Sequence, residues 1–186
     1  MKKFWRQFRP AILILLVLVV LCGAVYTGVM TGIAQLAFPA QANGSLITVT
    51  LKDGTQKTYG SALIAQEFTK PQYLVGRPMT VSNLSPVSSE QAKLVQERID
   101  WWHSFDPHNK AAIPADLVTG SGSGVDPSIS PAAAEYQVAR IAAARNIPES
   151  AVREVIRKYT TSRFLGFIGE PAVNVLQVNL ALDGLL

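Results

Sequence analysis

The chain is poor in the residues that most often build catalytic or metal sites. Its 186 residues include one cysteine and two histidines. Because Cys22 lies inside an apolar run, the rest of the chain can form no disulfide and must be held together by its core. The histidines, His103 and His108, have Asp106 between them. A metal site on these three residues stays open as an alternative, although a solvated helix end explains all of them.

Charged residues are absent from position 10 to position 51. Within that run, residues 11–30 are nearly all Leu, Val, Ile, Ala and Gly. About twenty residues at a helical rise of about 1.5 Å give roughly 30 Å, the thickness of the hydrocarbon core of a bilayer. A water-soluble helix would need a polar face, and this run has none. The sequence therefore predicts a transmembrane helix over residues 10–34.

A cleaved signal peptide is the main alternative for this segment. Basic residues, an apolar run and the small-residue pattern Ala40-Gln41-Ala42 are its ingredients. The apolar stretch of a secretory signal is only about 7–15 residues long, however, and the candidate cleavage site lies well beyond the end of the run. An uncleaved anchor is favoured.

The charges on either side of the span predict its orientation. Four cations precede it, namely Lys2, Lys3, Arg6 and Arg9, and the first charge after it is Lys52. Positive residues stay on the cytoplasmic side, so we expect a single-pass plasma-membrane protein with its N-terminus in the cytoplasm. The expected parts are a basic tail over 1–9, the span over 10–34, a neck over 35–45 and an extracytoplasmic domain over 46–186.

The same four cations equal the formal net charge of +4. The outer domain is therefore neutral despite the basic pI, and net charge gives no reason to expect a nucleic-acid partner. Residues 137–159 imitate a helix-turn-helix, with Arg153, Arg157 and Lys158 on the second helix. The expected topology and the neutral domain favour a packed helical hairpin over DNA binding.

The first half of the outer domain predicts both strands and helices. Residues 46–51 and 55–59 are β-prone and flank the turn signal Asp53-Gly54, which predicts a hairpin. A short helix is expected over 61–68. Ser88 with Gln91 is a capping box that begins a longer helix ending before Asp106-Pro107. Its apolar face comprises Leu94, Val95, Ile99, Trp102 and Phe105.

The second half predicts two helices and a strand. Ser130 is a good N-cap, followed by Pro131 at the first helical position. Helices are expected over 132–145 and 149–159. Residues 172–182 (AVNVLQVNLAL) alternate with a period of two and predict a strand. The outer domain is therefore expected to be α+β.

The loop over residues 115–130 (ADLVTGSGSGVDPSIS) admits several chemical interpretations. Consecutive backbone N–H groups could cradle phosphate, but the Gly-Lys-Ser/Thr ending of a P-loop is missing. Ser121 or Ser123 as a nucleophile would need a histidine base, and no Gly-x-Ser-x-Gly elbow is present. Asp116 and Asp126 could contact a hard cation such as potassium or calcium, although such residues are more often turn and cap residues.

Loops on a rigid scaffold commonly carry recognition, so this loop is the candidate contact or ligand site. No catalytic and no metal-ligating residues are assigned. The candidate residues are Asp116, Thr119, Gly120, Ser121, Gly122, Ser123, Gly124, Asp126, Pro127, Ser130 and Pro131.

The stretch PADLVTGSGSGVDPSISPAAA (residues 114–134) resembles the central signature of the C subunit of Kdp-type potassium-transporting ATPases. Further segments support the likeness, and the resemblance covers essentially the whole chain. They are NGS (43–45), GSALIAQ (60–66), YLVGRP (73–78) and LGFIGEPAVNVLQVNLAL (165–182).

The resemblance implies a non-catalytic, accessory subunit of a high-affinity, ATP-driven potassium importer. Its implied partners are a channel-like potassium-binding subunit, a P-type ATPase subunit and a small membrane peptide. Members of the family are described as raising the ATP affinity of the pump subunit, so ATP enters only through the complex. The expected topology places the loop outside, whereas ATP is inside, which favours docking on the channel-like subunit. An extracytoplasmic membrane-anchored hydrolase, or another binding module, is the alternative.

The sequence departs from the family pattern at several positions. Ser128 stands where His is usual, Ala172 where Arg is usual, and Ala65 where Gly is typical. The segment 79–89 is a shortened form of a longer Ser/Gly/Asn-rich stretch. Roles that the family assigns to that His or that stretch are not carried over.

Overall fold

The chain divides into two compact units, Met1–Leu46 and Ile47–Leu186, and each is described by itself. The computed structural model describes residues 2–186. Met1, the first residue of the expected cytoplasmic tail, lies outside them.

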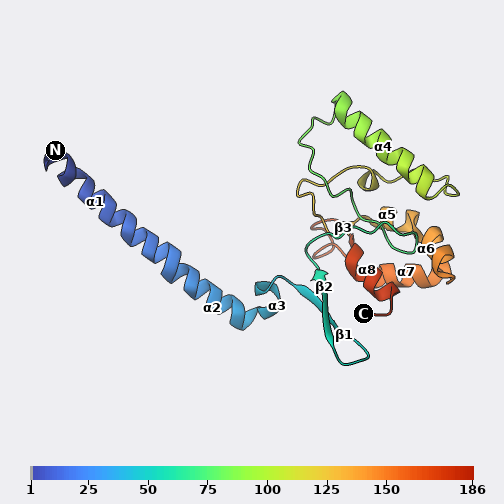
Figure 1. Ribbon diagram of the computed structural model, residues 1–186, viewed down its shortest axis with the longest axis horizontal. Coiled ribbons are helices and arrows are strands. Elements are labelled where there is room, and N and C mark those ends of the chain that lie inside the picture. Colours follow the sequence, from blue (N-terminus) through green and yellow to red (C-terminus); the bar gives the residue numbers. More distant parts are fainter. Residues whose placement is uncertain (1) are drawn as a thin grey trace. The chain divides into compact units, whose positions relative to one another are not determined.

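The first unit is a nearly continuous helix (Figure 1). It comprises α1 (Lys2–Leu18), a π-helical stretch (Val19–Tyr26) and α2 (Thr27–Ala37), with the short α3 (Pro39–Ala42) beyond. At the C-terminal end of the π-helical stretch, the Thr27 hydroxyl donates to the carbonyl of Cys22 at 2.9 Å. The helix over Phe8–Ala37 contains an 18-residue apolar window with a mean hydropathy of 2.8, and none of that window is buried. A helix long and apolar enough to span a membrane is thus confirmed.

The second unit begins with the expected hairpin of β1 (Leu46–Thr50) and β2 (Gln56–Ser61). Its turn contains Gly54 at φ 83°, a left-handed conformation that glycine adopts without strain. Asp53 Oδ1 accepts from the backbone N–H of Thr55 at 2.9 Å. The hydrogen bonds from Thr55 lower the pKa of Asp53. The hairpin prediction is confirmed.

The helix expected over residues 61–68 is wrong, because this segment continues from β2 into a turn and an extended chain. Long-range partners bind backbone groups that a helix would have used internally. The N–H of Ala65 donates to the carbonyl of Val125 at 2.9 Å. The carbonyl of Ala62 accepts from the Asn174 side chain at 2.8 Å. In residues 61–68, these long-range hydrogen bonds outweigh the local preference for a helix.

The aromatic helix is α4 (Ser89–Phe105), and its predicted cap and apolar face are confirmed. Ser88 Oγ accepts from the N–H of Gln91 at 3.2 Å. The Gln91 side chain does not return to the cap but accepts from the Ser82 hydroxyl. Trp102 is fully buried and Asp106 ends the helix.

The single helix expected over residues 132–145 is two helices, α5 (Pro131–Tyr136) and α6 (Val138–Arg145). The break falls at Gln137, whose side chain is buried and faces the backbone of Val75. The Nε2 of Gln137 donates to the carbonyl of Val75 at 3.0 Å, and its Oε1 accepts from the N–H of Val75 at 2.8 Å. Asn146 then ends α6 in a left-handed conformation at φ 53°.

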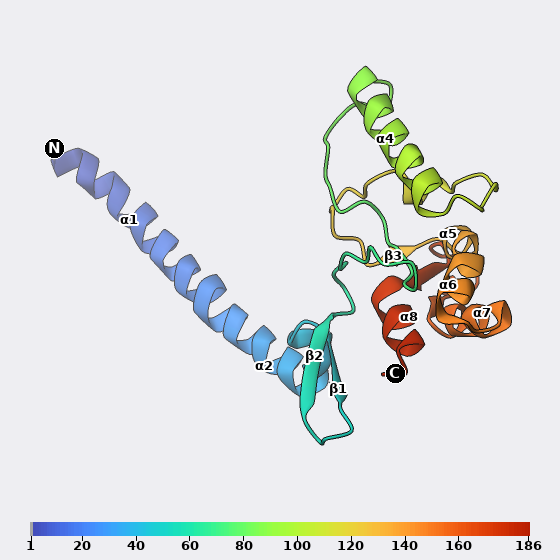
Figure 2. The same cartoon turned by 45° about the vertical axis from the view of Figure 1, so that its right-hand side comes forward.

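The helix α7 (Glu149–Lys158) follows, as expected. It packs against α6 and against the last helix, α8 (Val175–Leu182), and these three lie side by side in both views (Figures 1 and 2). Residues 137–159, which imitate a helix-turn-helix, therefore form a packed helical hairpin.

The strand expected over residues 172–182 is mostly wrong. Only β5 (Ala172–Asn174) is extended, and α8 (Val175–Leu182) follows at once. Asn174 is the cause, because its Oδ1 accepts from the N–H of Gln177 at 3.0 Å and caps the helix. The apolar residues that appeared to alternate as a strand lie on a wide buried helical face.

The short strands form an antiparallel sheet in the order β3-β5-β4, with β3 at Ser128–Ile129 and β4 at Thr160–Thr161. Ser128 pairs with Asn174, and Thr161 pairs with Ala172. Two of the three substituted positions named above, Ser128 and Ala172, thus lie in this small sheet. The second unit mixes helices and sheet, as expected.

Candidate functional site: the glycine- and serine-rich loop

The candidate loop, residues 115–130, is closed at its base by a side chain. It starts with a single helical turn at Ala115–Leu117. The carboxylate of Asp116 accepts from the N–H of Ser130 at 2.7 Å and from its hydroxyl at 3.2 Å. Ser130 Oγ in turn accepts from the N–H of Ala133 and caps α5. Asp116 therefore joins the start of the loop to the helix that follows it.

The first half of the loop is held against α4. Leu117 and Val118 are buried. The indole N–H of Trp102 donates to the carbonyl of Leu117 at 3.1 Å. Arg98 donates to the carbonyl of Val118 at 2.8 Å and to the hydroxyl of Thr80 at 2.9 Å. The loop and the segment 78–81 are thus fixed to the same arginine.

Two glycines let the loop approach that segment closely. A Cβ atom added to Gly120 would lie 2.4 Å from the carbonyl oxygen of Thr80, which is closer than atoms can pack. Gly124 is buried at φ 69°, and its Cβ would lie 2.7 Å from a methyl group of Val81. These glycines are required by the fit of the loop on its own domain.

The loop's tip differs, because Gly122 and Ser123 are exposed and an added Cβ at Gly122 meets nothing within 4 Å. The hydroxyls of Ser121 and Ser123 lie 3.2 Å apart. They accept from the N–H groups of Gly124 and Val125 at 3.0 and 3.2 Å. The tip is ordered by its own serines and still presents a free surface.

The exit of the loop faces Arg77. Asp126 Oδ1 accepts from the N–H of Ser128 at 3.0 Å, and its Oδ2 lies 3.9 Å from Arg77 Nη1. Arg77 Nη2 also donates to the carbonyl of Gly120 at 3.4 Å. The carbonyl of Pro127 accepts from the N–H of Val175 at the start of α8. Arg77 therefore contacts both sides of the loop.

Several groups that could take part in chemistry are engaged or lie apart from the loop. Two of the N–H groups that could have bound an anion, those of Gly124 and Val125, already donate to serine hydroxyls. His103 and His108 are exposed at the end of α4 and just after it. Among the described residues, no group of three or more His, Cys, Asp or Glu side chains could hold a metal ion.

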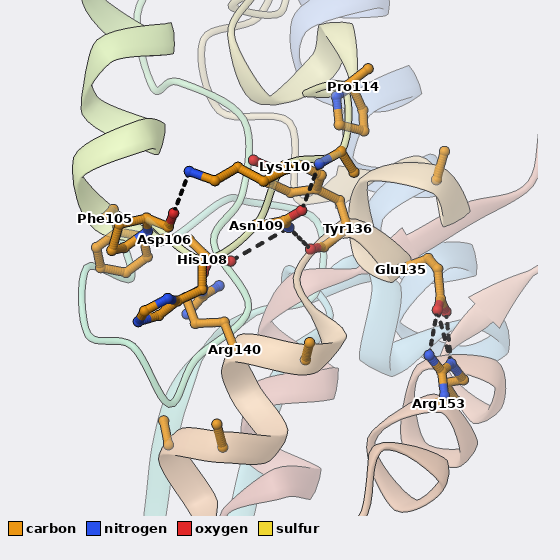
Figure 3. A pocket seen from close by; sticks show the side chains of 17 residues that line it. Phe105, Asp106, His108, Asn109, Lys110, Pro114, Glu135, Tyr136, Arg140 and Arg153 are labelled. Atoms are coloured by element: carbon orange, nitrogen blue, oxygen red, sulfur yellow. Dashed lines mark hydrogen bonds and ion pairs between the residues drawn. The ribbon is translucent and has the colours of Figure 1, made fainter.

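A second concave feature is an open depression of about 1010 Å³ between the end of α4 and the α5–α6 segment (Figure 3). Asn109 donates to the carbonyl of Tyr136 at 2.8 Å on its wall. Glu135 and Arg153 form an ion pair at 2.8 Å on its other side. Burial, and secondarily the charge of Asp106, raise the pKa of Tyr136.

Arg140 lies at the floor of this depression and is buried. Its guanidinium donates to the carbonyls of Pro71 and Tyr73 and to Gln137 Oε1. Burial lowers the pKa of Arg140 to about 10, so the side chain remains cationic at neutral pH. Since these contacts are to backbone carbonyls and a side chain of the domain itself, Arg140 serves the fold.

The sequence did not identify Arg77, Arg98 and Thr80 as parts of this site. Arg77 lies in the quoted segment YLVGRP, but its contact with the loop spans 43 residues of sequence. Local spacing carries no signal for such a contact. The structure brings the predicted loop residues together: Asp116, Gly120, Gly124 and Ser130 make close contacts within the domain, whereas Gly122 and Ser123 are exposed.

Comparison with known proteins identifies the family. A family model described as "K+-transporting ATPase, c chain" matches residues 8–184. A relative from Listeria monocytogenes is 53% identical over 100% of this chain and 99% of its own length. Relatives from Clostridium botulinum and Clostridium perfringens are 45% and 49% identical, over 100% and 96% of this chain and 100% and 97% of their own lengths. Each is named "Potassium-transporting ATPase KdpC subunit". The chain therefore belongs to the KdpC family.

Proposed function

We propose that the chain is an accessory, non-catalytic subunit of a high-affinity, ATP-driven potassium import complex. The observation that carries the proposal is the family match over nearly the whole chain, from residue 8 to residue 184. The helix over Phe8–Ala37 supports it, because a subunit of a membrane pump needs an anchor of this length.

The braced loop supports a role in assembly rather than catalysis. Arg98, Arg77 and Asp116 fix its two ends, while the tip at Gly122 and Ser123 remains exposed. A rigid loop with an open glycine tip suits contact with a facing protein surface, because little ordering cost is added on binding. The tip is proposed to contact the channel-like, potassium-binding subunit on the extracytoplasmic side.

The remaining partners proposed are a P-type ATPase subunit and a small membrane peptide. The chain is proposed to carry no cofactor of its own and to influence ATP affinity through the complex. The expected topology separates the loop from cytoplasmic ATP, so this influence would pass through partner subunits.

Affinity purification of the tagged full chain from its native membranes tests the proposal. We expect the potassium-binding and ATPase subunits to co-purify with the tagged chain. Potassium-stimulated ATPase activity should be present in the same purified fraction. A chain that lacks residues 1–37 and carries an added secretion signal is the control for the anchor. Recovery of the full chain without any ATPase subunit would contradict the proposal.

A further inference from the structure

An exposed apolar hairpin links β4 to β5, and residues 163–170 (RFLGFIGE) are here called the apolar finger. The N–H of Phe164 donates to the carbonyl of Ile168 at 2.8 Å, and the reverse bond is 2.9 Å. Leu165 and Gly166 turn the chain at φ 52° and 82°. The apolar finger is thus a defined hairpin tip.

Its four large apolar side chains are turned to solvent. Phe164 is 67% exposed, Leu165 69%, Phe167 73% and Ile168 50%. All residues from 161 to 170 are exposed, and none belongs to the core cluster. A contiguous exposed apolar patch of this kind marks a surface that binds a protein or a membrane.

The base of the apolar finger is pinned, so the exposure is built into the fold. Arg163 and Glu170 form an ion pair at 2.7 Å across the base. Immediately beyond them, Thr161 pairs with Ala172 in the small sheet. The four side chains are therefore held outward by a closed hairpin.

Cations lie close to this apolar tip in the sequence, in a domain whose overall charge is neutral. Arg157 and Lys158 are exposed in the last turn of α7, immediately before β4. With Arg163, residues 157–170 carry three cations and a single acid, Glu170, which is already paired with Arg163. Apolar residues next to Lys and Arg are the composition of segments that bind anionic lipid surfaces.

We propose that the apolar finger inserts into the interfacial layer of a bilayer that carries anionic headgroups. Phe164, Leu165, Phe167 and Ile168 enter the layer, and Arg157 and Lys158 contact the headgroups.

The anchor favours lipid over a protein partner. The same chain carries a helix able to span a bilayer. Covalent attachment to that helix raises the effective concentration of lipid around the finger, so even weak insertion is productive.

The test places a polarity-sensitive fluorophore on Phe167→Cys in the full chain, with Cys22→Ser removing the native thiol. The chain is reconstituted alone in vesicles of phosphatidylcholine and phosphatidylglycerol. Val87→Cys, at a position that is 94% exposed in the loop before α4, is the matched control. We expect a blue-shifted emission and strong quenching by nitroxide-labelled lipids at position 167, and neither at position 87.

A second variant tests the cations. Arg157→Glu combined with Lys158→Glu should weaken quenching at position 167 in the anionic vesicles and leave it unchanged in pure phosphatidylcholine. Thermal unfolding of each labelled chain confirms that the fold is intact.

The contrary outcomes are distinct. Equal quenching at positions 167 and 87, or none at either, would overturn the proposal. A blue shift that arises only when the other subunits of the complex are present would also overturn it and assign the apolar finger to a protein interface. The test does not depend on the function proposed above.

Discussion

The carboxylate of Asp116 accepts two hydrogen bonds from Ser130, one from the backbone N–H at 2.7 Å and one from the hydroxyl at 3.2 Å. The two residues lie 14 positions apart and enclose the whole glycine- and serine-rich loop. Since Ser130 also caps α5, one carboxylate couples the loop to the helical part of the domain.

Asp116→Ala should lower the free energy of unfolding by about 1–3 kcal/mol, because it leaves the half-buried donors of Ser130 without an acceptor. Asp116→Asn keeps one acceptor oxygen and should lose less. Denaturant unfolding of the full chain in detergent, followed by tryptophan fluorescence, measures both variants. If Asp116→Ala unfolds at the wild-type denaturant concentration, Asp116 does not close the loop in solution.

The three central glycines of the loop should respond differently to alanine. Gly120→Ala meets the Thr80 carbonyl, and Gly124→Ala adds a strained φ to a contact with Val81. Each should cost about 1–3 kcal/mol of unfolding free energy, as overpacking does. Gly122→Ala meets nothing and should change it by less than about 0.5 kcal/mol. Thermal unfolding ranks the three variants, and equal losses would refute this account.

The extended segment at Leu74 and Val75 is paired by side-chain amides instead of a neighbouring strand. Asn179 binds the N–H and carbonyl of Leu74 at 2.7 and 2.9 Å, as Gln137 does for Val75. Asn179→Ala should orphan both groups of buried Leu74, at about 1–3 kcal/mol each. Hydrogen exchange at Leu74 should accelerate far more than at Ile141, which serves as the reference. Unchanged exchange at Leu74 would show that water replaces the amide.

These amides show where sequence reasoning reached its limit. The cap at Ser88, the turn at Gly54 and the left-handed end at Asn146 follow from local chemistry and were predictable. Gln137 appeared to be an ordinary residue of the helix expected over 132–145, and Asn179 one of the alternating residues of the strand expected over 172–182. Their partners lie 62 and 105 positions away. Long-range pairing of this kind decides the break between α5 and α6 and leaves no local signal.

The sequence identified the loop as a candidate contact site, but it did not show which loop residues pack on the domain and which are exposed. Its glycines suggested flexibility, whereas Gly120 and Gly124 serve close packing on Thr80 and Val81. Arg98 could not be predicted as a loop contact, because the carbonyl of Val118 that it binds lies 20 positions away in the sequence. Gly122 and Ser123 are exposed at the tip of the predicted contact loop, together with Val125.

The orientation of the span remains a prediction from its charged flanks. Ser85 is exposed in the loop before α4, so Ser85→Cys, made with Cys22→Ser, should react with an impermeant thiol reagent added outside intact cells. Lys3→Cys in the same background should react only after permeabilisation, because positive flanks stay inside. Reaction at position 3 in intact cells would reverse the topology and bring the loop to the cytoplasmic side.

The last prediction concerns the loop tip as a contact surface. An added side chain at Gly122 enters open space, so Gly122→Val should leave the unfolding temperature of the chain nearly unchanged. In the assembled complex, the same side chain would press against any facing subunit, and overpacking of a tight contact costs about 1–3 kcal/mol. We therefore expect less co-purifying ATPase subunit and lower potassium-stimulated ATPase activity. Asp126→Ala should weaken assembly in the same way, whereas Asp126→Asn keeps an oxygen for the N–H of Ser128 and serves as its control. If Gly122→Val assembles with full activity, the tip is a spacer; if it unfolds the chain, the tip is structural.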